Sequence, residues 1–168
     1  MGVMNPIQWL ERNAPGFDTL SEKERAAITH FVLLWSLFEA RALSTCGSSR
    51  AILALTHDWL AQGRLVSELF SESLLYFQQR YYSSGMETDY LSGLNLRPND
   101  YRDLVYEVLK GDNTNPADCV AVLLIVVYRI RNNLFHGVKW AYGVQGQLSN
   151  FTHANATLMN ALSIVGLP

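Results

Sequence analysis

The segment from Arg131 to Gly137, Arg-Asn-Asn-Leu-Phe-His-Gly, gathers side chains that could act on a phosphate group. Arg131 carries a permanent planar cation that can bind two phosphate oxygens at once. His136 can accept and return a proton near neutral pH. Asn132 precedes His136 by one helical turn, so its carboxamide could hydrogen-bond the imidazole and set the tautomer. These residue types suit attack of a ribose 2′-hydroxyl on the adjacent phosphorus, which cleaves RNA without a metal ion.

In such a reaction, His136 would activate the hydroxyl or protonate the leaving oxygen, while Arg131 would stabilise the charge added in the transition state. One imidazole cannot readily serve as acid and base in a single step, so we expect a second copy of the segment across a two-fold interface. A purely structural role is the alternative, because Arg and His in a last helical turn also satisfy free carbonyl groups. Asn132 and Asn133 weigh against that alternative, since asparagine is an indifferent helix former.

The segment ends a strongly apolar stretch that predicts a central helix. Asn115 is placed to cap this helix and Pro116 to occupy its first position. Every residue from 120 to 127 is apolar, which predicts that other helices surround it. The helix is expected to run to about Phe135, with Gly137 stopping it in a left-handed conformation.

The rest of the chain also favours helices. Ser21 and Glu24 form the pattern of a capping box, in which each side chain bonds the backbone of the other residue. Residues 83–98 form a polar stretch that predicts a flexible loop, and residues 138–142 are ambiguous between strand and loop. We predict an all-α antiparallel helical bundle with short accessory helices, as a single domain over residues 1–168. Its further helices are expected at 6–12, 22 to about 43, 50–62, 64–82, 100–110 and 148–165, and 50–62 with 64–82 could be one bent helix.

Composition limits the classes of function. The chain has 168 residues, of which 49% are hydrophobic and 17% charged, and its net charge of −2 lacks the basicity of a general nucleic-acid binder. Any contact with RNA must therefore be confined to a small part of the protein surface. Cys46 and Cys119 provide neither a disulfide framework nor a paired metal-ligand spacing. With no signal-like N-terminus and no apolar run long enough for a bilayer, we expect a cytoplasmic protein without membrane contact, metal or cofactor.

Arg131-Asn132 followed by His136, with four residues between Arg and His, resembles the motif of HEPN-domain ribonucleases. That motif is Arg, a polar residue, a short spacer and His. The resemblance implies an all-helical bundle that forms a homodimer, in which two motifs make one composite RNA-cleaving site. It identifies Arg131 and His136 as the catalytic pair and Asn132 as the polar position. Arg25 and His30 share the spacing, but an alanine follows that Arg and no glycine ends a helix there.

The ending Asn-Leu-Phe-His-Gly resembles HEPN members of prokaryotic toxin–antitoxin and phage-defence systems. This resemblance implies a toxin or defence effector that is regulated by an antitoxin, such as a small nucleotidyltransferase.

Three further residues near the segment are candidates for RNA binding, namely Lys139, Arg129 and Asn133. The sequence favours a solvated surface position for Lys139 over a contact with phosphate, and a structural ion pair with Glu39 for Arg129 over a place in the RNA groove. Glu39 lies in an apolar helical stretch and therefore calls for a cationic partner, either Arg129 or Arg131. The main functional alternative is a non-catalytic HEPN-like module that mediates an interaction or senses a nucleotide.

Overall fold

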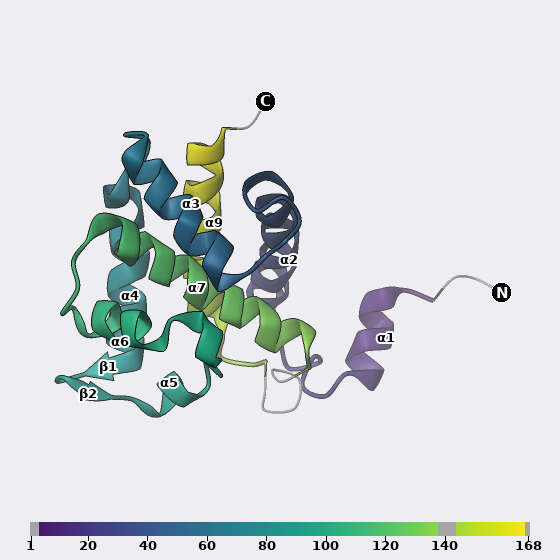
Figure 1. The fold of residues 1–168 in the computed structure, drawn as a ribbon. Coiled ribbons are helices and arrows are strands. Elements are labelled where there is room, and N and C mark those ends of the chain that lie inside the picture. Colours follow the sequence, from purple (N-terminus) through teal and green to yellow (C-terminus); the bar gives the residue numbers. More distant parts are fainter. Residues whose placement is uncertain (1–3, 138–143, 167–168) are drawn as a thin grey trace.

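A computed structural model describes residues 4–137 and 144–166 of the chain, and these residues form the predicted all-α bundle (Figure 1). Lys139 and the ambiguous stretch 138–142 lie outside the described residues. The α-helices are α1 (Pro6–Asn13), α2 (Glu22–Ala42), α3 (Ser49–Ala61), α4 (Ser71–Tyr81), α5 (Asp89–Ser92), α6 (Arg102–Lys110), α7 (Pro116–Phe135) and α9 (Leu148–Val165). Two 3₁₀ helices, η1 (Ser67–Phe70) and η2 (Pro98–Asp100), and a hairpin of β1 (Tyr82–Ser83) and β2 (Met86–Glu87) complete them.

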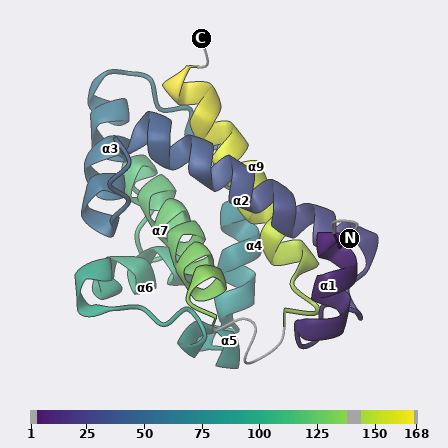
Figure 2. The same ribbon diagram turned by 90° about the vertical axis from the view of Figure 1, so that its right-hand side faces the viewer.

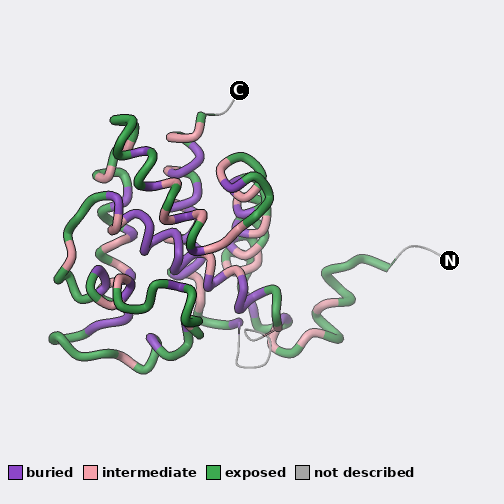
Figure 3. Tube along the Cα trace, in the orientation of Figure 1, coloured by how far each residue is buried: buried purple, intermediate pink, exposed green. Residues whose placement is uncertain are grey.

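Helix α7 is the centre of the bundle, as its apolar sequence predicts. Its residues from Val120 to Val127 are all buried, and α3, α4, α6 and α9 pack around it (Figure 3). The Asn115 side chain accepts hydrogen bonds from the amides of Ala117 and Asp118 at 3.0 and 3.1 Å, which confirms the predicted cap. The buried apolar middle of α7 thus sets the position of the polar last turn of this helix.

Helices α2 and α9 lie side by side, and α9 packs against α7 (Figure 2). The capping box at the start of α2 is present, because the Glu24 amide donates to Ser21 Oγ and the Ser21 amide donates to Glu24 Oε2. Phe31 of α2 meets Phe151 of α9 edge to face, with ring centroids 5.2 Å apart. Through these contacts α2 carries Trp35 and Glu39 towards the end of α7.

The prediction of a helix over residues 64–82 is wrong at its start. Gly63 adopts a φ of 66°, and the amides of Arg64 and Leu65 both donate to the carbonyl of Trp59, which closes the end of α3. The chain returns to helical structure only at η1. Helices α3 and α4 are therefore separate, and the 100–110 helix likewise starts later, at Arg102, because Tyr101 is left-handed with a φ of 54°.

Residues 83–98 contain more regular structure than the sequence predicts. Tyr82 pairs with Glu87 and Ser83 with Met86 in a short antiparallel hairpin. Ser84 and Gly85 connect the strands with φ values of 52° and 77°, and two left-handed residues in sequence are what a type I′ turn requires. Helix α5 follows and packs against α4, so this segment is tied to the bundle. Among the described residues, no helix is both long and apolar enough to cross a membrane.

Candidate functional site

Arg131 lies in the last turn of α7, where it contacts both α7 and α2. Its side chain is 27% exposed, and Nη2 lies 4.0 Å from Glu39 Oε2. Nη1 donates to Asn132 Oδ1 at 3.0 Å, and the guanidinium lies 4.9 Å from the centroid of the Phe135 ring. A carboxylate, a carboxamide and an aromatic face therefore hold the cation with part of it open to solvent.

Glu39 is itself held in place by two donors. The indole Nε1 of Trp35 donates to Oε2 and the Gly47 amide donates to Oε1, each at 3.2 Å. Gly47 has no side chain, and a Cβ atom at this position would overlap Glu39 Oε1. Of the two cationic partners that the sequence offers for Glu39, Arg131 is the one beside it. The carboxylate thus positions the guanidinium from a neighbouring helix.

His136 follows the last residue of α7 as its C-cap. Its amide donates to the Asn132 carbonyl at 2.9 Å, and Gly137 has the predicted left-handed φ of 75°. The residue is exposed, and among the described parts of the chain its imidazole has no hydrogen-bond or ion-pair partner. The ring is therefore open to a ligand or to a second protein chain.

Asn132 does not make the contact that its spacing predicts. The structure has no hydrogen bond between the Asn132 carboxamide and the His136 ring in the described residues. Asn132 is buried, and its Oδ1 accepts from Arg131 instead. Its carboxamide therefore orients the cation of the motif rather than the imidazole.

Arg131 and His136 do not share one face of α7. At 3.6 residues per turn, positions five apart point about 140° away from each other around the helix axis. The arginine side lies against α2, as its contacts with Glu39 and Trp35 show. Within one protomer, the two groups therefore flank the helix end rather than face a single point.

Arg129 is an interior residue, which corrects the expectation that it binds RNA. Only 3% of its surface is exposed. Its Nε donates to the Leu94 carbonyl at 3.1 Å, and Nη1 lies 3.6 Å from Asp100 Oδ2 rather than near Glu39. Burial lowers the pKa of Arg129, and the Asp100 charge opposes that shift. A buried, paired guanidinium serves the fold.

Asn133 is likewise buried and engaged within the protein. Its Nδ2 donates to the Gly93 carbonyl at 3.0 Å, and its Oδ1 accepts from Asn95 Nδ2 at 3.3 Å. With Arg129, it fastens the segment between α5 and η2 to α7. The RNA-binding role expected for Asn133 is therefore replaced by a structural one, and Lys139 lies outside the described residues.

The end of α7 thus presents a positioned cation and an exposed imidazole that has no partner among residues 4–137 and 144–166. Within the described residues, no three His, Cys, Asp or Glu side chains lie close enough together to hold a metal ion. Comparisons with family models, with curated proteins and with solved structures gave no match.

Proposed function

We propose that this protein is a HEPN-type endoribonuclease, which cleaves RNA without a metal ion at a composite site formed by Arg131 and His136 of two copies. One observation carries the proposal. At the end of α7, a guanidinium oriented by Glu39 and Asn132 is followed by an exposed imidazole with no partner among the described residues. A positioned positive charge and a proton carrier, brought together from two copies, are what cleavage of a phosphodiester by an internal hydroxyl needs.

The reaction assigns a separate task to each group. One imidazole removes the proton of the 2′-hydroxyl, whose oxygen forms a bond to phosphorus while the bond from phosphorus to the 5′-oxygen breaks. The second imidazole protonates that leaving oxygen. The guanidinium stabilises the additional negative charge on the phosphoryl oxygens in the transition state. The products are a 2′,3′-cyclic phosphate, which can open to a 3′-phosphate, and a 5′-hydroxyl.

The geometry of one copy supports the pairing of two. Arg131 and His136 diverge by about 140° around α7, so a second helix end is needed to bring an imidazole to each side of a phosphate. The half-exposed ring of Phe135 beside Arg131 offers apolar surface for such a contact. As a toxin or defence effector, the dimer would be held inactive by an antitoxin partner, such as a small nucleotidyltransferase.

The decisive test is incubation of the purified protein with a defined RNA in EDTA, alongside the same RNA with a single 2′-deoxy nucleotide at the cut position. We expect cleavage of the all-ribose substrate alone. His136→Ala and Arg131→Ala should each lower the rate by about 10²–10³-fold, as loss of a general acid–base or of a charge-stabilising donor does.

His30→Ala and Arg41→Ala are matched controls, because both side chains are exposed on α2 outside the motif. These variants should cleave as the wild type does. Cleavage of the deoxy substrate, or full activity in His136→Ala, would contradict the proposal.

The contact between Glu39 and Arg131 favours a second candidate, because a neighbouring carboxylate offsets part of the cation's charge. This candidate is a non-catalytic module that binds a nucleotide phosphate, or a partner, at the same turn. It predicts that nucleotide raises the melting temperature while RNA stays intact.

A further inference from the structure

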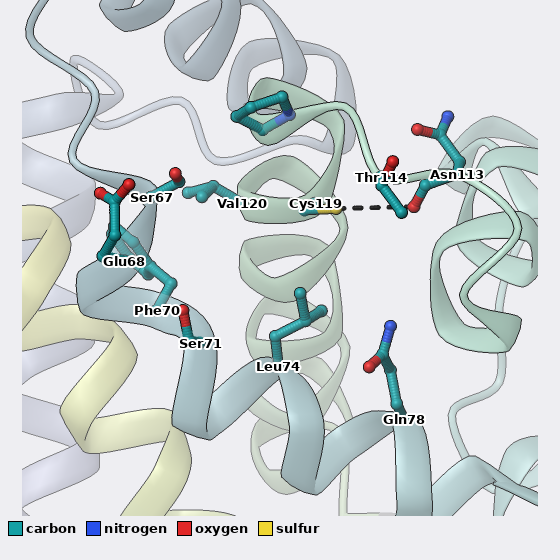
Figure 4. Close-up of a pocket in the computed structure, with 11 residues that line it drawn as sticks. Ser67, Glu68, Phe70, Ser71, Leu74, Gln78, Asn113, Thr114, Cys119 and Val120 are labelled. Carbon is teal, nitrogen blue, oxygen red and sulfur yellow. Dashed lines mark hydrogen bonds between the residues drawn. The ribbon is translucent and has the colours of Figure 1, made fainter.

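A cavity of about 400 Å³ lies at the opposite end of α7 from Arg131, between the first turns of that helix, η1 and α4 (Figure 4). Its volume is within the range of small-molecule sites, which is about 300–1,000 Å³. Phe70, Leu74 and Val120 give it an apolar wall. The cavity is thus a site separate from the proposed RNA-cleaving turn.

The charged side chain that lines the cavity is negative. Glu68 contributes a carboxylate, and no Lys, Arg or His lines the described cavity. Glu68 is exposed and has no ion pair among the described residues. Burial raises the pKa of the Cys119 thiol in the cavity, and the charge of Asp118 raises it further. The formal charge of the lining therefore favours a cation over an anion.

Hydrogen-bonding groups around the cavity are biased towards acceptors. Gln78 Nε2 donates to the Val108 carbonyl at 2.8 Å, which leaves its Oε1 to accept. Asn113 Nδ2 donates to Asp118 Oδ2 at 3.1 Å, and the Cys119 thiol points to the Asn113 carbonyl at 3.6 Å. Gln78 and Asn113 thus each donate a hydrogen bond within the protein, while the Ser67, Ser71 and Thr114 hydroxyls in the lining can accept as well as donate. A ligand that brings its own N–H groups therefore finds acceptors here.

We propose that this cavity binds a small organic ammonium ion, with its charged head at Glu68 and a hydrocarbon body against Phe70 and Leu74. The head gains a charge-assisted hydrogen bond from the carboxylate. Burial of the hydrocarbon body adds the hydrophobic term.

Cys119 provides a built-in reporter, because the chain has only one other thiol, the exposed Cys46. In a Cys46→Ala variant, methanethiosulfonate reagents would form a disulfide with the Cys119 thiolate and release methanesulfinate. We expect a trimethylammonium reagent to react at least about threefold faster than a sulfonate reagent of similar size, because the lining charge is negative. The same ratio of rates, measured at Cys46 in a Cys119→Ser variant, corrects for the difference in intrinsic reactivity between the two reagents.

Glu68→Gln should lower this preference, with the remainder due to the Asp118 charge next to Cys119, and leave the fold intact, since Glu68 is exposed. Glu72→Gln is the matched control, because Glu72 is exposed one turn later and does not line the cavity. Equal rates for both reagents in the Cys46→Ala protein, or a preference that Glu68→Gln leaves undiminished, would overturn the proposal.

Occupancy is tested by protection of Cys119 against a neutral thiosulfonate. Phenethylammonium chloride should slow the modification in a saturable way, and Glu68→Gln should weaken that protection. The neutral 2-phenylethanol and the anionic 3-phenylpropionate have similar bodies without the cation and should protect far less. Absence of saturable protection, or equal protection by 2-phenylethanol, would show that the cavity does not select ammonium ions.

Discussion

Gly47 supports the position of the Arg131 cation through Glu39. Its amide holds Glu39 Oε1, and its missing side chain leaves room for that oxygen. In Gly47→Ala, the new Cβ would push the carboxylate away from Trp35 and from Arg131. We expect a loss of about 1–2 kcal/mol in the free energy of unfolding, as for a broken partly buried hydrogen bond, and slower RNA cleavage.

Urea unfolding followed by circular dichroism would measure the change in stability. Glu39→Gln is the informative companion, since it keeps the shape and one acceptor oxygen while it removes the charge next to Arg131. It should cost less stability than Gly47→Ala. A Gly47→Ala protein as stable and as active as the wild type would show that Glu39 does not position the cation.

His153 gives the molecule a pH dependence in the mildly acidic range. Its ring stacks on Tyr76 with centroids 4.1 Å apart, and Ser73 Oγ lies 3.3 Å from Nδ1. Burial lowers the pKa of His153 below its ordinary value of 6.5, while the charge of Glu72 acts in the opposite direction. The unfolded chain therefore binds the proton more readily, so stability should fall as pH drops through 6.5 towards the folded pKa.

Unfolding midpoints in urea between pH 5.5 and 7.5 test this dependence. His153→Gln should flatten the profile, whereas His30→Gln should leave it unchanged because His30 is exposed on α2. If stability instead rises on acidification, the sign of the His153 shift is contradicted.

At the scale of elements, Asp100 joins η2 to two helices. Its Oδ1 accepts from Ser49 Oγ of α3 at 2.6 Å, its Oδ2 accepts from the Arg97 amide at 2.7 Å, and Arg129 of α7 lies beside it. Asp100→Ala would leave a buried guanidinium without its counter-charge. We expect a loss of about 3–5 kcal/mol in the free energy of unfolding.

Asp103→Ala is the control, since Asp103 lies nearby in the first turn of α6 and is exposed. It should change stability only slightly. A similarly small effect of Asp100→Ala would mean that the buried ion pair contributes little to the free energy of unfolding. The burial of the Arg129 charge would then need another explanation.

Local signals explain why most helices are predictable. The cap at Asn115, the capping box of Ser21 and Glu24, and the period of the apolar residues all act within one or two turns of the chain. The errors lie where conformation depends on less local effects. Ser84 and Tyr101 are left-handed without being glycine or asparagine, and their residue types do not predict this.

The same distinction applies to the candidate site. The position of Arg131 and His136 at a helix end follows from Pro116 and Gly137, which lie in the same segment. The ion pair of Arg129 cannot be predicted from its own segment, because its partner Asp100 is brought beside it only by the tertiary fold. The sequence pattern around Asp100 instead predicts the start of a helix. A buried ion pair between distant segments leaves no spacing signal in one sequence.

At the scale of the whole molecule, the proposed activity depends on assembly. Each protomer has a mass of 18.9 kDa, and the diverging Arg131 and His136 require a dimer of about twice that mass. Light scattering of the purified protein checks this expectation. A strict monomer that still cleaves RNA would place the complete site within one chain.

Mixing of chains tests whether one site is built from two copies. When wild-type and His136→Ala chains are exchanged by joint refolding, a dimer with one imidazole lacks either its acid or its base. Activity should then follow the square of the wild-type fraction, so an equal mixture retains about one quarter of the activity instead of about one half. Mixing with Arg41→Ala, an exposed position outside the motif, should cause no loss. A linear dependence on the His136→Ala fraction would show that each protomer cleaves independently, and the second imidazole would have no place in the reaction.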